Sequence, residues 1–87
     1  MRFRAYDWDT DNVDHIARHG IEPWEAEAAC RGGLIIRGRQ GRYIAYGRTE
    51  AGRYLVVILH AQGGGMAHVI TAREMNQSER RFYQGRH

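Results

Sequence analysis

Four strand-like segments occupy residues 34–71 and limit what this chain can fold into. Apolar side chains recur with a period of two in residues 34–37, 42–48, 53–60 and 66–71. The connections between these segments contain glycine and have hairpin length, so neighbouring segments are expected to pair antiparallel. The sequence therefore predicts an antiparallel sheet built from consecutive hairpins.

Pairing of Arg48 with Arg53 would set the register of the middle hairpin and decide which side chains share a face. One face would then carry Arg42, Ile44, Tyr46, Arg48, Leu55, Val57 and Leu59, and the other Tyr43, Tyr54, Val56, Ile58 and His60. Three consecutive glycines before the last segment leave its register open, so His68 is compatible with either face. Because residues 54–59 are apolar on both sides, helices or a partner are expected to cover both faces.

Helix signals flank the sheet segments at the N-terminal side. Residues 2–8 alternate in character and are expected to form a short edge strand. Asp9 or Thr10 can cap a helix that Gly20 would end in the left-handed conformation. Glu22-Pro23 then begins a second helix, because proline suits the first helical position, and Gly32-Gly33 ends it.

A C-terminal helix is expected directly after the last strand. Asn76 and Glu79 have the spacing of a capping box, in which each side chain accepts a hydrogen bond from the other residue's backbone N–H. The predicted fold class is therefore α+β: two short N-terminal helices, an antiparallel sheet of four to five strands, and a C-terminal helix. A chain of 87 residues is expected to form one domain over residues 1–87.

The composition favours a globular protein with an acidic partner. Apolar residues make up 43% of the chain and charged residues 26%, which argues against disorder. The net charge is +3 and all 13 basic residues are arginine, whose planar fork suits phosphate, although genomic base composition explains the arginine preference equally well. Cys30 is the only cysteine, so an internal disulfide and a cysteine-rich zinc site are excluded. The sequence shows no signal peptide and no membrane-length apolar run, and a reducing cytoplasm is expected.

Three motifs follow one another along nearly the whole chain. They are Trp8-Asp9 with His15-Ile16-Ala17-Arg18-His19-Gly20-Ile21, then Gly47-Arg48-Thr49-Glu50-Ala51-Gly52-Arg53-Tyr54-Leu55-Val56-Val57, then Ile70-Thr71-Ala72-Arg73-Glu74-Met75 with Glu79-Arg80-Arg81-Phe82-Tyr83. In this order and spacing they resemble the BrnT family of toxins. The resemblance implies a fold similar to RelE-type toxins, a ribonuclease activity that blocks translation, and a BrnA-like antitoxin that neutralises the toxin and binds operator DNA.

The chain departs from the family pattern at three positions. His15 and Arg18 stand where BrnT-like proteins commonly have asparagine and lysine, and His68 stands where they tend to have arginine. The change at Arg18 preserves charge. The change at His68 removes a permanent cation and either weakens phosphate binding or adds an acid–base group.

RNA can be cut without a metal ion when its 2′-hydroxyl attacks the neighbouring phosphate. The reaction needs a base, an acid and cations for the developing charge. Histidine suits the first two roles because its reference pKa lies near neutral pH, and arginine suits the third. The candidate catalytic residues are Arg73, Arg48, His15, His68, His60 and Tyr83, with His19 and Glu79 as further acid–base candidates, and the candidate RNA phosphate-binding residues are Arg80, Arg18 and Arg42.

Each candidate also has an ordinary structural explanation. His15 and His19 can form the polar flank of a helix, and their spacing lacks the glutamate of a zinc-protease motif, so no metal is expected. Arg73 can form an ion pair with Glu79. Arg42, Arg53 and Arg81 read as solvated surface charge.

Three functions compete at this stage. The leading one is a ribonuclease toxin that needs no cofactor, with RNA and an antitoxin as partners and with operator DNA reached only through the antitoxin complex. The second is a non-catalytic nucleic-acid-binding or protein-binding module that uses the arginines for phosphate contact. The third is a structural subunit whose apolar sheet face receives another chain.

Overall fold

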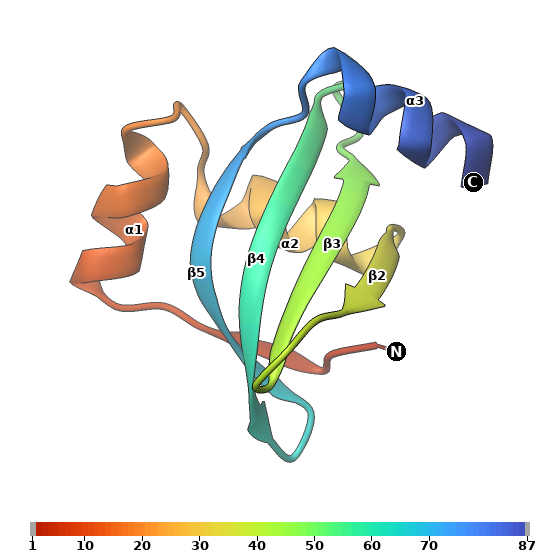
Figure 1. Ribbon diagram of the computed structural model, residues 1–87. Helices are drawn as coiled ribbons and strands as arrows, with labels where there is room; N and C mark the ends of the chain where they lie inside the picture. The colour runs from red at the N-terminus through yellow and green to blue at the C-terminus, as the bar shows by residue number, and fades with distance from the viewer. Residues whose placement is uncertain (1, 87) are drawn as a thin grey trace.

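The chain folds into one five-stranded sheet with three helices (Figure 1). The computed structural model describes residues 2–86. The elements in chain order are β1 (Ala5–Asp7), α1 (Thr10–Ala17), α2 (Pro23–Arg31), β2 (Leu34–Arg37), β3 (Arg42–Arg48), β4 (Tyr54–Gly63), β5 (Met66–Glu74) and α3 (Gln77–Arg86). The predicted α+β class, with two short helices before the sheet and one after it, is confirmed.

The strands lie in the order β1-β5-β4-β3-β2, with β4 at the centre. Strands β2 to β5 pair antiparallel through consecutive hairpins, as predicted. Strand β1 instead pairs parallel to β5, which makes the sheet mixed. A three-residue strand carries too little pattern to fix its direction; here the backbone N–H of Arg4 donates to the carbonyl of Gly65 (2.7 Å), which places β1 beside the start of β5.

The predicted register of the β3–β4 hairpin is wrong by one residue. Arg48 lies opposite Tyr54 and not Arg53. The loop holds five residues, because the N–H of Thr49 donates to the carbonyl of Arg53 (2.9 Å) and Gly52 takes a φ of +92°. A one-residue shift exchanges the faces of a strand. Arg48 and Tyr54 therefore share a face.

The β4–β5 hairpin extends beyond its predicted ends. Gly64 and Gly65 both have positive φ, which a two-residue hairpin turn of this kind requires. The register shifts at Ile58/Leu59 and again at Ala61/Gly63, and between the two shifts His60 lies opposite His68. His68 therefore lies on the same face of the sheet as His60.

Helix α1 is joined to the sheet by a buried asparagine. Asp9 caps the helix and forms a reciprocal capping box with Asn12, at 2.7 and 2.9 Å. The Asn12 amide also donates to the carbonyls of Asp7 and Val69, both at 2.9 Å. One side chain thus connects the helix start to β1 and β5. Gly20 ends this segment with φ +73°, as predicted.

Helices α1 and α2 cover one face of the sheet. The core on that face contains Ile16, Ile21, Ala26, Ala29, Ala45, Leu55, Val57, Leu59, Val69 and Ala72, among others. Helix α2 comes very close to β3 at Gly47, where an added Cβ would lie 1.9 Å from the Ala29 carbonyl oxygen. Cys30 is buried in this core, and burial raises the pKa of its thiol to about 12.

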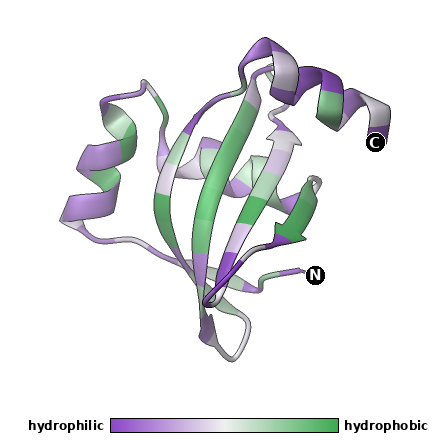
Figure 2. Cartoon of the chain, in the orientation of Figure 1, coloured by the Kyte–Doolittle hydropathy of each residue, from purple (hydrophilic) through white to green (hydrophobic). Residues whose placement is uncertain are grey.

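The other face is covered at one end only. Helix α3 crosses the sheet there, and Tyr83 and Met75 pack with Val56 in a second small core (Figure 1). Farther down the same face, Ile44, Ile58 and Thr71 are half-buried. We call this side of the sheet the open face. Helices or a partner were expected to cover both faces. The chain's own helices cover one face and one end of the other, and Figure 2 shows the apolar central strand beside the largely hydrophilic α3.

Candidate active site

Two guanidinium groups lie against the ring of Tyr54 beneath α3. The Arg80 guanidinium carbon is 4.1 Å from the Tyr54 ring centroid, and that of Arg48 is 5.4 Å away. Both distances fall in the range of favourable cation–π contact. The β3–β4 register supplies Arg48 and Tyr54, and α3 supplies Arg80.

A second phenol completes this group. The Tyr83 ring lies 6.1 Å from that of Tyr54 at an angle of 74°. An open cavity of about 580 Å³ adjoins both rings and is lined by Gly32, Arg48, Thr49, Glu50, Tyr54, Tyr83 and Gln84. We call Arg48, Tyr54, Arg80 and Tyr83 the phenol–arginine cluster. It brings three of the predicted site residues together and adds Tyr54.

The two phenols of the cluster have pKa values that shift in opposite directions. A hydrogen bond from the Gln84 amide (3.4 Å), with the charges of Arg48 and Arg80, lowers the pKa of Tyr54 below its usual value. Burial, reinforced by the neighbouring Tyr54, raises the pKa of Tyr83. Neighbouring titratable groups with divergent pKa values are typical of acid–base pairs.

Arg73 forms a bidentate ion pair with Glu79, with both N–O distances at 2.7 Å. An ion pair with Glu79 was the structural explanation that the sequence offered for Arg73. Glu79 also accepts the backbone N–H of Asn76 (2.9 Å), and the Asn76 side chain accepts the N–H of Glu79 (2.8 Å), so the predicted capping box is confirmed. The pair raises the pKa of Arg73 and lowers that of Glu79. Arg73 thus connects the end of β5 to the start of α3.

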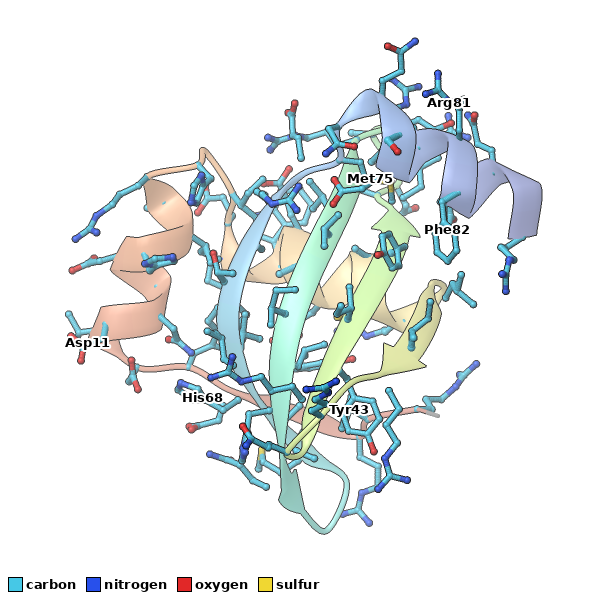
Figure 3. The ribbon with its side chains drawn as sticks, viewed as in Figure 1. Asp11, Tyr43, His68, Met75, Arg81 and Phe82 are labelled. Atoms are coloured by element: carbon cyan, nitrogen blue, oxygen red, sulfur yellow. The ribbon has the colours of Figure 1, made fainter. Side chains whose placement is uncertain are left out.

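The predicted histidines on the sheet lie at the other end of the open face. His68 pairs through Nδ1 with Asp7 Oδ2 at 3.0 Å, and this bond lowers the pKa of Asp7. His60 lies between His68 and Arg42 in adjacent strands. Tyr54 and His60 lie six residues apart on β4, so about 20 Å separates this group from the phenol–arginine cluster. In Figure 3, His68 lies at the opposite end of the sheet from Arg81 and Phe82 of α3.

The remaining predicted residues lie on and beside α1. His15 and His19 are exposed, with ring centroids 5.8 Å apart, while Asn12 and Ile16 form the buried side of the helix. This supports the interpretation of the two histidines as a polar flank. Arg18 is exposed at the C-terminal cap. Figure 1 shows α1 at the β5 side of the sheet, away from the helix that carries Arg80.

Arg53 was expected to be solvated surface charge, and the structure corrects this. Its guanidinium donates to the buried Glu25 (3.0 Å), to Glu74 (2.8 Å) and to the carbonyl of Gly20 (3.0 Å). These bonds raise its pKa. Arg53 therefore ties the α1–α2 connection and α2 to the ends of β4 and β5. Because Tyr54, and not Arg53, lies opposite Arg48, Arg53 is on the face of the sheet that the helices cover.

Tyr54 and Gln84 lie at the candidate site but were not predicted from the sequence. The assumed register put Tyr54 on the face opposite Arg48. The available signal was the helical spacing of Arg80, Tyr83 and Gln84, which places all three near one side of a C-terminal helix. With the loop taken as the five residues Thr49–Arg53, the sequence would have placed Tyr54 on the same face as Arg48 and next to that side of the helix.

Within residues 2–86, no three histidine, cysteine, aspartate or glutamate side chains are grouped closely enough to hold a metal ion. In the same range, none of the helices has the length and apolar character needed to cross a membrane.

Comparison with known proteins identifies the family. The model of the family described as "Ribonuclease toxin, BrnT, of type II toxin-antitoxin system" matches residues 8–79. No curated protein matches the sequence. The crystal structure of the Brucella abortus ribonuclease toxin BrnT has a similar fold, with a TM-score of 0.69 and 22% identity over 84% of this chain and 97% of that one. The chain thus belongs to the BrnT family of ribonuclease toxins of type II toxin–antitoxin systems.

Proposed function

We propose that this protein is an endoribonuclease that cleaves RNA without a metal ion, at the phenol–arginine cluster. The observation that carries the proposal is the contact of two guanidinium groups with one phenol beside an open cavity. Arginine binds phosphate oxygens through paired hydrogen bonds. A phosphate held by Arg48 and Arg80 would therefore lie next to the Tyr54 hydroxyl.

In this proposal, one tyrosine hydroxyl of the cluster is the base and the other is the acid. Tyr54 acts as the base in its phenolate form, which its lowered pKa favours, and takes the proton of the 2′-hydroxyl as that oxygen attacks phosphorus. Tyr83, whose pKa is raised, holds its proton and donates it to the departing 5′-oxygen. The products are a 2′,3′-cyclic phosphate and a free 5′-hydroxyl. Arg48 and Arg80 stabilise the charge that develops on the phosphate oxygens.

Arg73 acts mainly by positioning α3 in this proposal. Its two guanidinium NH₂ groups bond Glu79, and Glu79 caps the helix that carries Arg80 and Tyr83. Loss of Arg73 would displace both cluster residues. An Arg73→Ala variant is thus expected to lose activity through the helix.

Membership of the BrnT family supports a proposal for the biological setting. Cleavage of cellular RNA would inhibit translation in the cytoplasm, and a BrnA-like antitoxin would neutralise the toxin. Operator DNA would be bound only by the complex with the antitoxin. The open face, which α3 leaves uncovered beyond the cluster, offers an apolar surface for such a partner.

Incubation of purified protein with RNA, with and without EDTA, tests the proposed reaction. Cleavage that persists in EDTA and leaves 2′,3′-cyclic phosphate or 3′-phosphate ends is the expected result. Intact RNA at a large excess of protein would contradict it. Salt-sensitive binding without turnover would instead indicate a module that only contacts the phosphate backbone.

A further inference from the structure

The β2–β3 hairpin has a basic sequence that the proposed active site does not use. Residues 37–42 read Arg-Gly-Arg-Gln-Gly-Arg, and the side chains of Arg37, Arg39 and Arg42 are exposed. We call these three residues the hairpin arginines. Among residues 2–86, none of the three has an acidic partner within ion-pair distance, whereas Arg31 and Arg73 each have one and Arg53 has two.

The turn that carries these arginines is held in place. Gln40 and Gly41 both have positive φ, at 57° and 77°, and the N–H of Arg42 donates to the carbonyl of Arg39 at 3.0 Å. The N–H of Ala61 donates to the carbonyl of Gly41 at 2.8 Å, which fixes the turn to β4. Cations on a fixed turn lose less entropy when they bind an anion than cations on a mobile one.

The hairpin arginines lie at one end of the sheet, and they do not all lie on the same face. Arg42 lies opposite His60 and shares the open face with it, whereas Arg37 lies opposite Tyr43 on the other face. The carboxylate of Asp7 lies at the same end but is engaged by His68 (3.0 Å) and Gln62 (3.3 Å). The positive charge of the hairpin is therefore left available for a ligand.

The open face connects this end to the phenol–arginine cluster. Ile44 and Ile58 lie between the two groups of arginines and are half-buried. From Tyr54 to His60 the distance along β4 is about 20 Å. A single strand of RNA can follow this path, with phosphates at both ends and bases over the apolar surface, since single-stranded RNA binds sheets through its unstacked bases.

We infer that Arg39 and Arg42 form a second phosphate-binding surface, which holds the backbone of single-stranded RNA at a distance from the bond that is cut. The inference rests on the proposed function, because it assumes that the RNA reaches the phenol–arginine cluster. It assigns Arg39 and Arg42 to substrate binding and not to the chemical step, and it leaves out Arg37, which lies on the covered face. The substrate is then a strand long enough to span both groups of arginines.

Binding of non-cleavable RNA tests the assignment. Fluorescence anisotropy with fully 2′-O-methylated strands would compare a trimer with a dodecamer, for the wild type and for Arg39→Gln/Arg42→Gln. The double variant should bind the dodecamer about tenfold more weakly at low salt, and the slope of log affinity against log salt should fall by about 1.4, at roughly 0.7 per lost phosphate contact. Its affinity for the trimer should not change.

Arg31→Gln is the control for loss of charge. Arg31 is exposed on α2, on the covered side of the sheet, and its ion pair with Glu27 is solvated. This variant should bind both strands as the wild type does. In cleavage assays, the Arg39→Gln/Arg42→Gln variant should have a higher KM for a long RNA and an unaltered kcat.

Three results would overturn the inference. They are equal weakening for the trimer and the dodecamer, unchanged binding of both, and weaker binding of the antitoxin with RNA binding unchanged. Failure of the proposed function is distinguishable: a wild type that binds the dodecamer through Arg39 and Arg42 but cleaves no RNA contradicts the cleavage mechanism alone. Thermal unfolding of the double variant shows whether the protein still folds.

Discussion

Gly47 determines how closely α2 can lie on the sheet. A Cβ at this position would come within 1.9 Å of the Ala29 carbonyl oxygen and 2.6 Å of its carbon, and both are backbone atoms that cannot rotate away. Gly47→Ala should therefore destabilise the fold by about 3 kcal/mol, since α2 must move off a close-packed core. Urea unfolding followed by circular dichroism measures this change.

Gly32 provides the matched control at the end of the same helix. A Cβ there would meet no atom within 4 Å, and its φ of −105° is accessible to alanine. Gly32→Ala should leave the unfolding midpoint nearly unchanged. If Gly47→Ala unfolded at the same urea concentration as Gly32→Ala, the close approach of α2 to β3 would be wrong.

Single residues also show where prediction from sequence ends. The capping residues Asp9, Asn76 and Glu79 were predictable because each acts within one helical turn of its own segment. The position of Tyr54 was not predictable, because the face on which it lies depends on the number of unpaired residues in the preceding loop. The predicted register put Tyr54 and Arg48 on opposite faces, whereas the observed register, shifted by one residue, puts them on the same face.

At the scale of elements, the docking of α3 depends on Glu79 as well as on apolar contacts. Tyr83 is the one buried residue of this helix, and Phe82 is half-buried with its ring 5.1 Å from that of Tyr46. Glu79→Gln keeps an oxygen that can accept the N–H of Asn76, but it removes the charged partner of Arg73. Amide hydrogens of α3 should exchange faster in this variant, with β4 unchanged, as measured by hydrogen–deuterium exchange. Equal exchange in α3 of both proteins would contradict an anchoring role for this pair.

The same pair makes the docking of α3 sensitive to acid. The hydrogen bonds from Arg73 lower the pKa of Glu79 in the folded state below the unperturbed value of 4.5. The folded state then binds fewer protons than the unfolded state, so the stabilisation is complete above about pH 4.5 and is lost as the pH falls through the lower pKa. The stability of the wild type should exceed that of Glu79→Gln at pH 7 and converge with it in acid. A difference that grew in acid would contradict this sign.

Element boundaries illustrate a second limit of the sequence. Strands β2 and β3 were predicted with their observed ends, because alternation and glycine turns bound them locally. The parallel pairing of β1 depends on a contact with Gly65 about 60 residues away, which no local pattern contains. The incomplete cover of the open face is likewise a property of the assembled sheet.

On the scale of the whole molecule, the open face has two chemically different ends. Arginines and tyrosines gather under α3, whereas His60, His68 and Asp7 lie at the far end. The sequence predicted a single site that combined arginines with histidines. The length of β4 separates them, so the proposed cleavage is centred at one end.

The rate of RNA cleavage in EDTA by Tyr54→Phe and by His60→Gln/His68→Gln tests the central claim most directly. Tyr54→Phe keeps the ring that Arg48 and Arg80 contact and removes only the hydroxyl. Its kcat should fall by about 10²- to 10⁴-fold, the usual contribution of one acid–base group, and the histidine variant should show a much smaller change. Wild-type kcat in Tyr54→Phe, with activity lost in the histidine variant, would contradict the account and place the reaction at the other end of the sheet.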